Sequence, residues 1–382
     1  MMKFFIILLV LVTGFLGWTL FNPQKNKISS LPIVPTGSEK VEEIQEITTS
    51  EIPQQTTIVE GLDTPWAIAF LPDQGMLVTE RPGRVRLVDK NGKLQVSPVA
   101  TLEKVKEIGE GGLLGIALHP DFSSNGFVYL YYTYSGEEND TFNRVVRMIY
   151  KDGKLIDEKI IVDKIPGNSN HNGGRITFGP DKFLYITTGD AQNSSQAQDR
   201  YSLAGKILRV TDDGKPASNN PFNNLVYSFG HRNPQGLAWD SLGRLWSTEH
   251  GRSGIQSGLD ELNLIESGKN YGWPTIQGDQ TQVGMITPII HSGPNATWAP
   301  AGAAFIGNSV FFGGLRGQTL YEAVLEGEKV TLKEHFKGEF GRIREVIKGQ
   351  DGMLYITTSN QDGRGIPNLG DDKIIKVNPN KL

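Results

Sequence analysis

The chain has no cysteine among its 382 residues. Disulfides, thiol nucleophiles, thiolate zinc sites and a lipid on an N-terminal cysteine are therefore excluded. An excess of basic residues is also missing, since 38 Lys and Arg stand against 42 Asp and Glu, for a formal net charge of -4. A nucleic-acid-binding domain usually carries a clustered basic face, so no nucleic-acid partner is expected.

Helical periodicity is weak throughout, and residues 100–108 hold at most a short helix. Short runs of β-branched and aromatic residues instead alternate with turns rich in Gly, Asp and Pro, a pattern typical of strands. The composition, 38% hydrophobic and 21% charged, is ordinary for one large globular unit. The sequence therefore predicts an all-β domain.

Charge is absent from residues 4–21, an apolar run of 18 residues. This length is near the lower limit of a membrane span, roughly 17 to 25 residues, and exceeds the about 7 to 15 residues usual in the apolar part of a signal peptide. No good cleavage site follows, so residues 1–21 are predicted to be an uncleaved signal anchor, with a cleaved signal peptide as the alternative. Either predicts export to the periplasm or cell exterior, and the anchor adds attachment to the cytoplasmic membrane.

Residues 22–55 contain four prolines among Ser, Thr, Glu and Gln, with too few apolar residues to form a core. This composition predicts a disordered linker. The folded domain is accordingly expected over residues 56–382.

This domain repeats one unit, a polar turn with an aspartate followed by a β-branched and aromatic strand. The turns lie about 50 to 60 residues apart, a period typical of four-stranded propeller blades. The last interval is twice as long and holds a degenerate copy at residues 307–312, which makes six units. A sandwich or barrel, the alternative, would not predict this repeat, so the prediction is a six-bladed β-propeller. The turn aspartates are Asp73, Asp121, Asp181, Asp240 and Asp351.

Polar clusters rich in glycine adjoin several of the predicted strands, as expected for a site built on loop tips. Loops on one face of a propeller converge on its central channel, so His171, Arg232 and Gly251 are expected to meet there. The clusters cover residues 170–175, 188–190, 230–236 and 249–252.

Together with residues 110–122 (EGGLLGIALHPDF), 260–263 (DELN) and 270–274 (NYGWP), the clusters HNGGR and GHRNPQG make the chain resemble the soluble glucose/sorbosone dehydrogenase family. The resemblance is greatest to its aldose sugar dehydrogenases that use pyrroloquinoline quinone (PQQ), and it covers about residues 56–377 in matching order and spacing. It implies PQQ-dependent oxidation of aldose sugars at C1 to the lactone, with electrons passing on to an unidentified acceptor.

The resemblance also implies roles for individual residues. His171 falls on the general base, which takes the proton of the anomeric hydroxyl as hydride leaves C1, a task suited to imidazole at neutral pH. Asp190 falls on the carboxylate that orients this histidine. A turn histidine and a turn-closing aspartate are the structural alternatives for these two residues.

Four residues fall on cofactor-binding positions of the family: Glu110, Arg232, Asn233 and Arg316. Arginine there would oppose the carboxylates of PQQ and the charge that develops on its reduced oxygen. Structural ion pairs are the alternative for the two arginines.

Calcium is implied in the same way. The backbone carbonyls of Gly251 and Arg252 fall on ligands of an active-site Ca²⁺, a hard cation that prefers oxygen. Glu261 and the carbonyl of Tyr271 fall on a second, structural calcium site found in some members.

Two positions depart from the family pattern. Glu110 stands where some relatives have Gln, and Asn170 stands where an acid precedes the histidine. Both changes affect sugar contacts, so a broad aldose range is expected rather than glucose preference.

Two other function classes remain open. One is a calcium-dependent propeller lactonase or other hydrolase, which would need carboxylate and asparagine side chains around the metal. The other is a non-catalytic extracellular binding propeller that retains the channel residues without a cofactor. Titration with PQQ separates the dehydrogenase from both.

Overall fold

The computed structural model describes residues 52–254, 257–327 and 329–382. The predicted signal segment, 1–21, and all but the last few residues of the predicted linker lie outside the described residues, so both stay predictions. Among the residues that are described, no helix is both long and apolar enough to cross a membrane.

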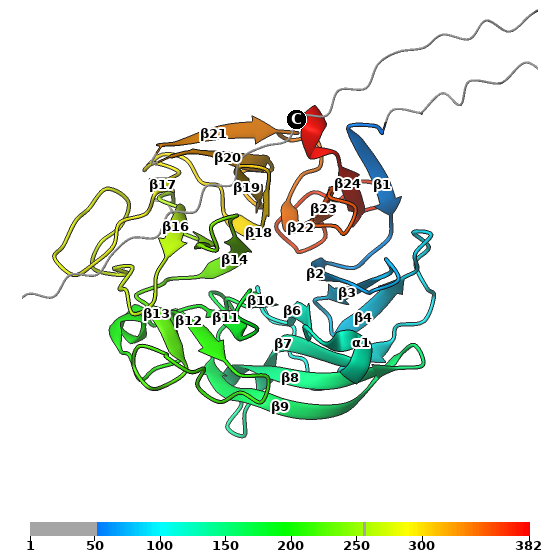
Figure 1. The fold of residues 1–382 in the computed structure, drawn as a ribbon, viewed down its shortest axis with the longest axis horizontal. Helices are drawn as coiled ribbons and strands as arrows, with labels where there is room; N and C mark the ends of the chain where they lie inside the picture. The colour runs from blue at the N-terminus through cyan, green and yellow to red at the C-terminus, as the bar shows by residue number, and fades with distance from the viewer. Residues whose placement is uncertain (1–51, 255–256, 328) are drawn as a thin grey trace, which may run out of the picture. The chain divides into compact units, whose positions relative to one another are not determined.

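The described domain consists of six four-stranded antiparallel sheets arranged in a ring (Figure 1). The predicted six-bladed β-propeller is thereby confirmed. Blades one to five are each built from four consecutive strands. These are β2 (Pro65–Phe70), β3 (Met76–Glu80), β4 (Arg84–Val88) and β5 (Ala100–Thr101); β6 (Leu113–Leu118), β7 (Phe127–Ser135), β8 (Thr141–Lys151) and β9 (Lys154–Pro166); β10 (Ile176–Phe178), β11 (Leu184–Thr188), β12 (Lys206–Val210) and β13 (Val226–Phe229); β14 (Pro234–Trp239), β15 (Leu245–Glu249), β16 (Glu261–Ile265) and β17 (Ile290–His291); and β18 (Pro300–Ile306), β19 (Ser309–Gly314), β20 (Leu320–Glu326) and β21 (Lys329–His335).

Blade six combines both ends of the domain. Its inner strands are β22 (Ile343–Lys348), β23 (Leu354–Thr358) and β24 (Ile374–Val377), and its outermost strand is β1 (Gln55–Val59). Gln55 pairs with Val377, and the Asn378 N–H donates to the Gln54 carbonyl at 2.8 Å. The first strand in sequence therefore closes the ring, and it begins one residue before the predicted start of the domain.

The first strand of each blade lies nearest the centre, where β2 contacts β6 and β18 contacts β22 (Figure 1). Because the strands are antiparallel, the residues before each first strand and after each second strand share one face of the ring. The turn that joins these two strands lies on the opposite face. All the predicted polar clusters are of the former kind, so the topology gathers them on one face.

The repeated aspartates occupy the turns of the opposite face. In four of these turns the carboxylate accepts the backbone N–H two residues further on, at 2.9 to 3.2 Å. The turn at Asp121 is instead widened by the short helix α1 (Phe122–Asn125). Residues 102–108 form no helix, and two short 3-10 helices, η1 (Ser194–Gln198) and η3 (Pro379–Lys381), complete the regular elements described.

A second repeated residue joins neighbouring blades. Thr79, on the second strand of blade one, donates its hydroxyl to the Leu114 carbonyl of blade two at 2.6 Å. Thr248 of blade four donates in the same way to Ala301 of blade five at 2.7 Å. Both threonines are fully buried, so these bonds satisfy backbone carbonyls that the ladders leave free. Thr357 of blade six donates likewise to Pro65 of blade one at 3.4 Å, so a threonine of the repeated unit joins neighbouring blades at three of the six seams.

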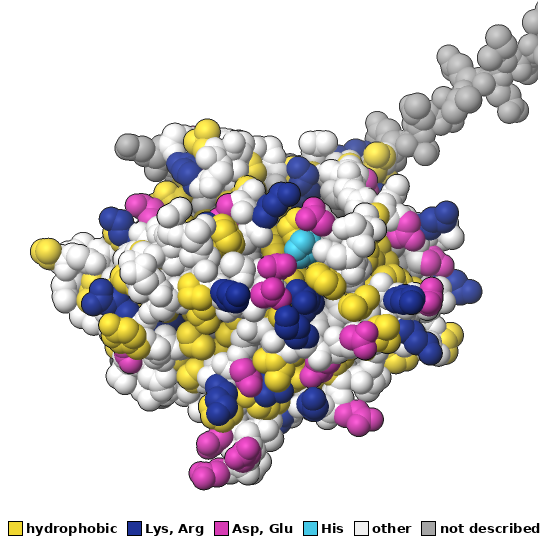
Figure 2. Space-filling model, turned by 60° about the horizontal axis from the view of Figure 1, so that its bottom comes forward, with side chains coloured by type: hydrophobic (Ala, Val, Ile, Leu, Met, Phe, Trp, Pro, Cys, Tyr) yellow, Lys and Arg dark blue, Asp and Glu magenta, His cyan; other side chains and the backbone are white. Residues whose placement is uncertain are grey.

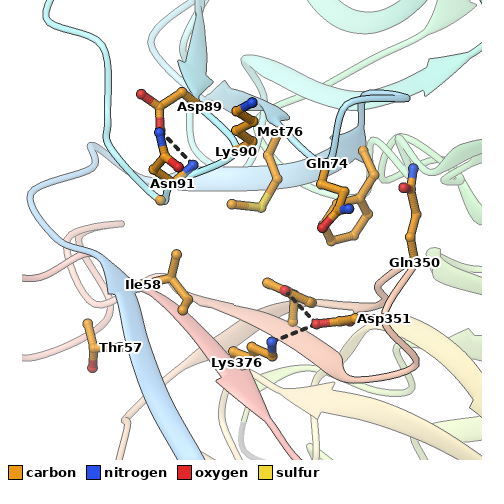
Figure 3. A pocket seen from close by; sticks show the side chains of 13 residues that line it. Thr57, Ile58, Gln74, Met76, Asp89, Lys90, Asn91, Gln350, Asp351 and Lys376 are labelled. Atoms are coloured by element: carbon orange, nitrogen blue, oxygen red, sulfur yellow. Dashed lines mark hydrogen bonds and ion pairs between the residues drawn. The ribbon is translucent and has the colours of Figure 1, made fainter.

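A hollow of about 410 Å³ lies at the seam between blades six and one (Figure 3). Two of its charged groups form an ion pair: the Asp351 carboxylate lies 2.6 Å from the Lys376 ammonium and accepts the Tyr355 hydroxyl at 3.1 Å. Asp181, Tyr185 and Arg209 repeat this arrangement in blade three. A constellation that recurs in two blades with its polar groups satisfied is a blade-packing device, and the functional site lies elsewhere.

The face shown in Figure 2 carries Lys and Arg side chains interspersed with Asp and Glu. No basic stripe of the kind that tracks a nucleic-acid backbone is visible on that face.

Candidate active site

A cavity of about 590 Å³ lies among the loops on the face of the ring that carries the predicted polar clusters. It is lined by loops that precede β6, β10, β14, β18 and β22 and by loops that follow β15, β19 and β23. His171, Arg232 and Gly251 meet here, as the propeller geometry predicts. Six of the residues named from the sequence line this cavity: Glu110, His171, Arg232, Gly251, Arg252 and Arg316.

His171 and Asp190 form a close pair. The Nδ1 atom of His171 lies 2.7 Å from Oδ1 of Asp190, which is buried behind it. Burial opposes the ionised carboxyl, but the hydrogen bonds and charge it receives, His171 foremost, lower the pKa of Asp190. An ionised Asp190 accepts the proton on Nδ1, which leaves Nε2 as the basic nitrogen. The ring is thus held in the tautomer that a general base requires.

Gly189 makes this pairing possible. A Cβ atom at this position would lie 1.9 Å from the His171 carbonyl oxygen, well inside contact distance. Any side chain would therefore push the two loops apart and separate the histidine from the aspartate. This is the physical reason for glycine in the cluster at residues 188–190.

Asp190 is held by further donors. The indole Nε1 of Trp273 donates to Oδ2 at 2.8 Å, and the Gln192 N–H donates to Oδ1 at 2.8 Å. The Trp273 carbonyl in turn accepts the side-chain amide of Gln198, at the end of η1, at 2.6 Å. Asp190 thus positions His171, Trp273 positions Asp190, and the loop that carries η1 positions Trp273.

Lys206 anchors that loop. Its side chain is fully buried, and Nζ donates to three carbonyls, of Gln196, Ala197 and Ala204, at 2.5 to 3.0 Å. The ammonium group therefore joins the two ends of the loop that carries η1. No feature of the sequence alone distinguishes this lysine from a surface one.

Replacing Lys206 with Met is expected to lower the free energy of unfolding by about 3 kcal/mol or more, since three buried carbonyls lose their donor at roughly 1 to 3 kcal/mol each, offset in part by relaxation of the loop. Urea denaturation of the two proteins measures this. Lys159→Met is the matched control, because Lys159 forms a largely exposed pair with Asp213 that is screened by solvent and is expected to contribute little to stability. Equal effects of the two substitutions would contradict the anchoring role.

Arginine dominates the charge of the cavity. Four of its arginines have no carboxylate within ion-pair distance among the described residues. Arg232 is buried and donates to the Ser253 hydroxyl at 2.6 Å, and Arg344 is buried and donates to the Gln235 amide oxygen at 2.5 Å. Burial lowers the pKa of Arg344 to about 9, so it remains charged at neutral pH. The four are Arg232, Arg252, Arg316 and Arg344.

Several buried nitrogen atoms around the cavity lack any hydrogen-bond partner among the described residues. They include Nε of Arg232, Arg252 and Arg344, together with Nε2 of His250. Buried polar atoms are normally satisfied, so such a group of unpaired donors next to uncompensated cations indicates a site for an anionic ligand. The side chains present therefore fit a polycarboxylate such as PQQ.

The loop at Gly251 lines the same cavity, and of its two predicted calcium-binding carbonyls that of Arg252 already accepts the Gly258 N–H at 3.3 Å. Asp260 accepts the Gly251 N–H at 2.7 Å and also accepts the N–H groups of Trp298 and Ala299, so it fixes this loop against blade five. No described residue donates a hydrogen bond to the Gly251 carbonyl. Within the described ranges, no group of three or more His, Asp and Glu side chains could hold a metal ion. A cation here would depend on backbone oxygens and on the ligand.

Glu261 and Tyr271 lie outside the main cavity and line a much smaller adjoining hollow with Glu249 and Gly251. Burial and the nearby Glu249 charge raise the pKa of Glu261 to about 8. Its carboxylate accepts the Asn263 side-chain amide at 3.1 Å. Glu261 thus lies beside a second carboxyl, Glu249, in one hollow, where a bound cation would favour its ionised form, and this fits the predicted second calcium position.

Asn233 does not reach the cavity. It is fully buried, and its Oδ1 atom accepts the Gly173 N–H at 2.9 Å, next to His171 in sequence. Its contact is therefore with the loop that carries the histidine.

Sequence reasoning missed four charged or titratable residues that line the cavity. Burial lowers the pKa of His250 to about 4, so it is neutral at neutral pH. Arg342 immediately precedes β22, the position that Asn233 occupies before β14, so the repeat could have identified it, and Arg344 lies two residues further on within β22. No local signal identifies the fourth, Arg364, which comes from the loop after β23. The four are His250, Arg342, Arg344 and Arg364.

A six-bladed propeller with a histidine–aspartate pair and uncompensated arginines in one channel cavity has the site of an enzyme that holds an anionic cofactor. Comparison with known proteins defines the family. The profile of the glucose/sorbosone dehydrogenase family matches residues 62–369. The chain therefore belongs to this family of oxidoreductases.

Individual relatives agree with that assignment. The PQQ-bound aldose sugar dehydrogenase of Streptomyces coelicolor has a TM-score of 0.78 and 41% identity over 84% of this chain and 96% of its own. The aldose sugar dehydrogenase YliI of Escherichia coli is 33% identical over 84% of this chain and 91% of its own. Quinoprotein glucose dehydrogenase B of Acinetobacter calcoaceticus is 32% identical over 65% of this chain and 57% of its own.

Proposed function

We propose that this protein is an exported dehydrogenase that oxidises aldose sugars at C1 to lactones, with PQQ as hydride acceptor and Ca²⁺ beside it. The observation that carries the proposal is one cavity that combines the His171–Asp190 pair with four arginines lacking carboxylate partners. The PQQ-bound relative from Streptomyces coelicolor supports the choice of cofactor. The predicted N-terminal anchor supports export and attachment to the membrane.

Each group of residues has its own role in the proposed reaction. His171 Nε2 accepts the proton of the anomeric hydroxyl, and Asp190 stabilises the imidazolium that forms. Arg232, Arg252, Arg316 and Arg344 bind the cofactor carboxylates, with Arg232 braced against the Trp273 ring at 5.3 Å. When bound, PQQ supplies the two-electron acceptor for the hydride. An acceptor of still unknown chemistry then takes the electrons onward.

Calcium is assigned to two positions. The Gly251 and Arg252 carbonyls would hold the ion next to the cofactor, where it supplies Lewis-acid stabilisation. Glu261 and the Tyr271 carbonyl would hold the second ion, which neutralises the buried carboxylates. The lactonase alternative needs several side-chain ligands around one ion, and the described residues gather no such set.

Calcium is expected to stabilise the protein through Glu261, more strongly at pH 8 than at pH 6. In the metal-free protein the Glu261 pKa of about 8 lies above the ordinary 4.5, so the carboxyl stabilises the fold fully below about pH 4.5 and this contribution is lost as the pH rises through about 8. The melting temperature of the chelator-treated protein should therefore fall by about 2 to 5 °C between pH 6 and pH 8, and added Ca²⁺ should restore it.

Glu261→Gln should remove both the pH effect and most of the response to Ca²⁺. Glu326→Gln, at an exposed position on β20, is the control and should retain both. A Glu261→Gln protein that still responds fully to Ca²⁺ would show that the ion does not bind at this carboxylate.

Dye reduction tests the proposal as a whole. The purified domain, residues 52–382, is assayed with a panel of aldoses, with and without PQQ and Ca²⁺. Activity that requires PQQ supports the dehydrogenase. Binding of PQQ without activity would refute the substrate class or the base, and failure to bind PQQ would favour the binding-propeller alternative.

A further inference from the structure

Arg364 reaches the rim of the active-site cavity from the far end of the sequence. It lies in the loop between β23 and β24 of blade six, whereas His171 precedes β10 of blade three. Its Nη1 donates to Oε1 of Glu110 at 2.5 Å, and its Nη2 donates to Oδ1 of Asn170 at 2.8 Å. One guanidinium group thus joins the residue that precedes the candidate base in sequence and the carboxylate that accepts the backbone N–H of this base.

The loop that carries Arg364 is fixed at its base. Asp362 accepts both Arg342 Nε, at 2.9 Å, and the Arg364 N–H, at 2.9 Å. The Asn360 side chain donates to the Phe340 carbonyl at 3.0 Å. The position of the guanidinium is therefore set by blade six, and its contact with Glu110 and Asn170 does not depend on their holding a free loop in place.

The Glu110 carboxylate is held in its ionised form by its contacts with Arg364 and with the His171 backbone. Burial opposes its ionised form, but the charges of His250 and Arg364 and the hydrogen bonds from Arg364 and the His171 N–H lower the pKa of Glu110 to about 2. Arg364, whose Nη1 atom lies 2.5 Å from Oε1 of Glu110, supplies a direct compensating charge. Its Oε2 atom accepts the His171 N–H at 3.1 Å. Both carboxylate oxygens of Glu110 are thus engaged within the protein.

Arg364 itself retains unused donors. A guanidinium group has five N–H donors and no acceptor, and the two contacts with Glu110 and Asn170 use two of them. Its side chain is 51% exposed, in contrast to the buried Arg232 and Arg344. A sugar whose C1 hydroxyl reaches His171 lies among the residues that line the cavity around it, which include Asn170, Glu110 and Gln192. The free donors of Arg364 point to hydroxyl oxygens as their acceptors.

We propose that Arg364 is a specificity-determining residue, which binds the hydroxyl groups of the aldose remote from C1 and holds Glu110 and Asn170 in place for the same purpose. This inference rests on the proposed function. It also accounts for the two departures from the family pattern, because an acid at position 110 and an amide at position 170 are the two partners that the arginine binds. The proposed substrate is a neutral aldose whose hydroxyl groups remote from C1 accept hydrogen bonds from the protein.

The test compares kcat and KM for pairs of aldoses that are epimers at C2, C3 or C4, in the PQQ- and Ca²⁺-loaded protein. Arg364→Ala is expected to lower kcat/KM by about 10- to 100-fold for the preferred epimer, mainly through KM, and much less for the poorer epimer, since a lost hydrogen bond to one hydroxyl is felt only by the sugar that presents it. PQQ titration should give an unchanged affinity. Arg244→Ala, which removes an arginine paired with Asp240 on the opposite face, should leave every value unchanged.

A second background separates direct binding from support of Glu110. In Glu110→Gln protein the carboxylate charge is absent, so an Arg364 that acted only by neutralising it would become dispensable. We expect Arg364→Ala still to reduce discrimination between epimers in this background. Loss of that effect, or an equal fall in kcat/KM for all sugars, would overturn the inference. Wild-type protein that binds PQQ but oxidises no aldose would instead refute the proposed function.

Discussion

Replacing His171 with Ala is expected to lower kcat for aldose oxidation by about 100-fold or more, the scale of losing a positioned general base. The expectation follows from the 2.7 Å contact between Nδ1 and Asp190, which leaves Nε2 as the proton acceptor. The measurement is dye reduction by the PQQ-loaded protein under saturating sugar. Affinity for PQQ, measured by titration, should change little because the arginines are untouched.

Two further variants test whether the loss of kcat is specific to the His171–Asp190 pair. His335→Ala removes a histidine that pairs with Glu322 on the outer strand of blade five and should leave kcat unchanged. Asp190→Asn should also lower kcat, because an amide no longer stabilises the imidazolium. If His171→Ala retained more than about a tenth of the wild-type kcat, another group would have to be the base.

The second large effect is expected at Arg232. Its replacement by Ala should raise the dissociation constant for PQQ by about 100-fold or more, because truncating one partner of a buried charged contact typically costs about 2 to 5 kcal/mol. Arg232 is 5% exposed and has no carboxylate within ion-pair distance among the described residues, so a carboxylate of bound PQQ is expected to supply its direct counter-charge. Titration of the metal-loaded protein with PQQ, followed by absorbance, measures the change without any turnover.

Arg244→Ala again serves as the control, since Arg244 is compensated by Asp240 at 2.7 Å. A variant of Arg232 that bound PQQ with wild-type affinity would mean that the unpaired arginines are not the cofactor site. Lower thermal stability without weaker binding would assign Arg232 a packing role against Trp273.

The fold was predictable from sequence because its signals are local and repeated. In four of the turns the aspartate accepts an N–H two residues away, and in three blades a threonine on the following strand bonds to the next blade. Such residues recur wherever the same hairpin recurs, so the number of blades can be counted. The degenerate unit at residues 307–312 lacks the aspartate but still forms the turn between β18 and β19.

The site was predictable only in part. His171 and Asp190 lie nineteen residues apart within one blade, and the glycines around them mark the close approach of two loops. Arg364 meets Glu110 across 254 positions of sequence, a contact that no local pattern encodes. The buried position of Lys206 could not be predicted for another reason. A lysine that donates to three backbone carbonyls shows no sequence pattern that distinguishes it from a solvent-exposed lysine.

The way in which β1 joins β24 has a consequence for biosynthesis. β1 is translated before every other strand of the ring, yet its partner is the last, roughly 320 residues later. Until β24 has been synthesised, β1 has no ladder partner, and until β23 has been synthesised, β2 lacks the blade-six threonine that donates to Pro65. Unpaired strands of this kind recruit other chains, and pairing over such a separation is slow. The nascent chain is therefore expected to depend on factors that shield the exposed β1 strand until β24 emerges, whichever compartment it folds in.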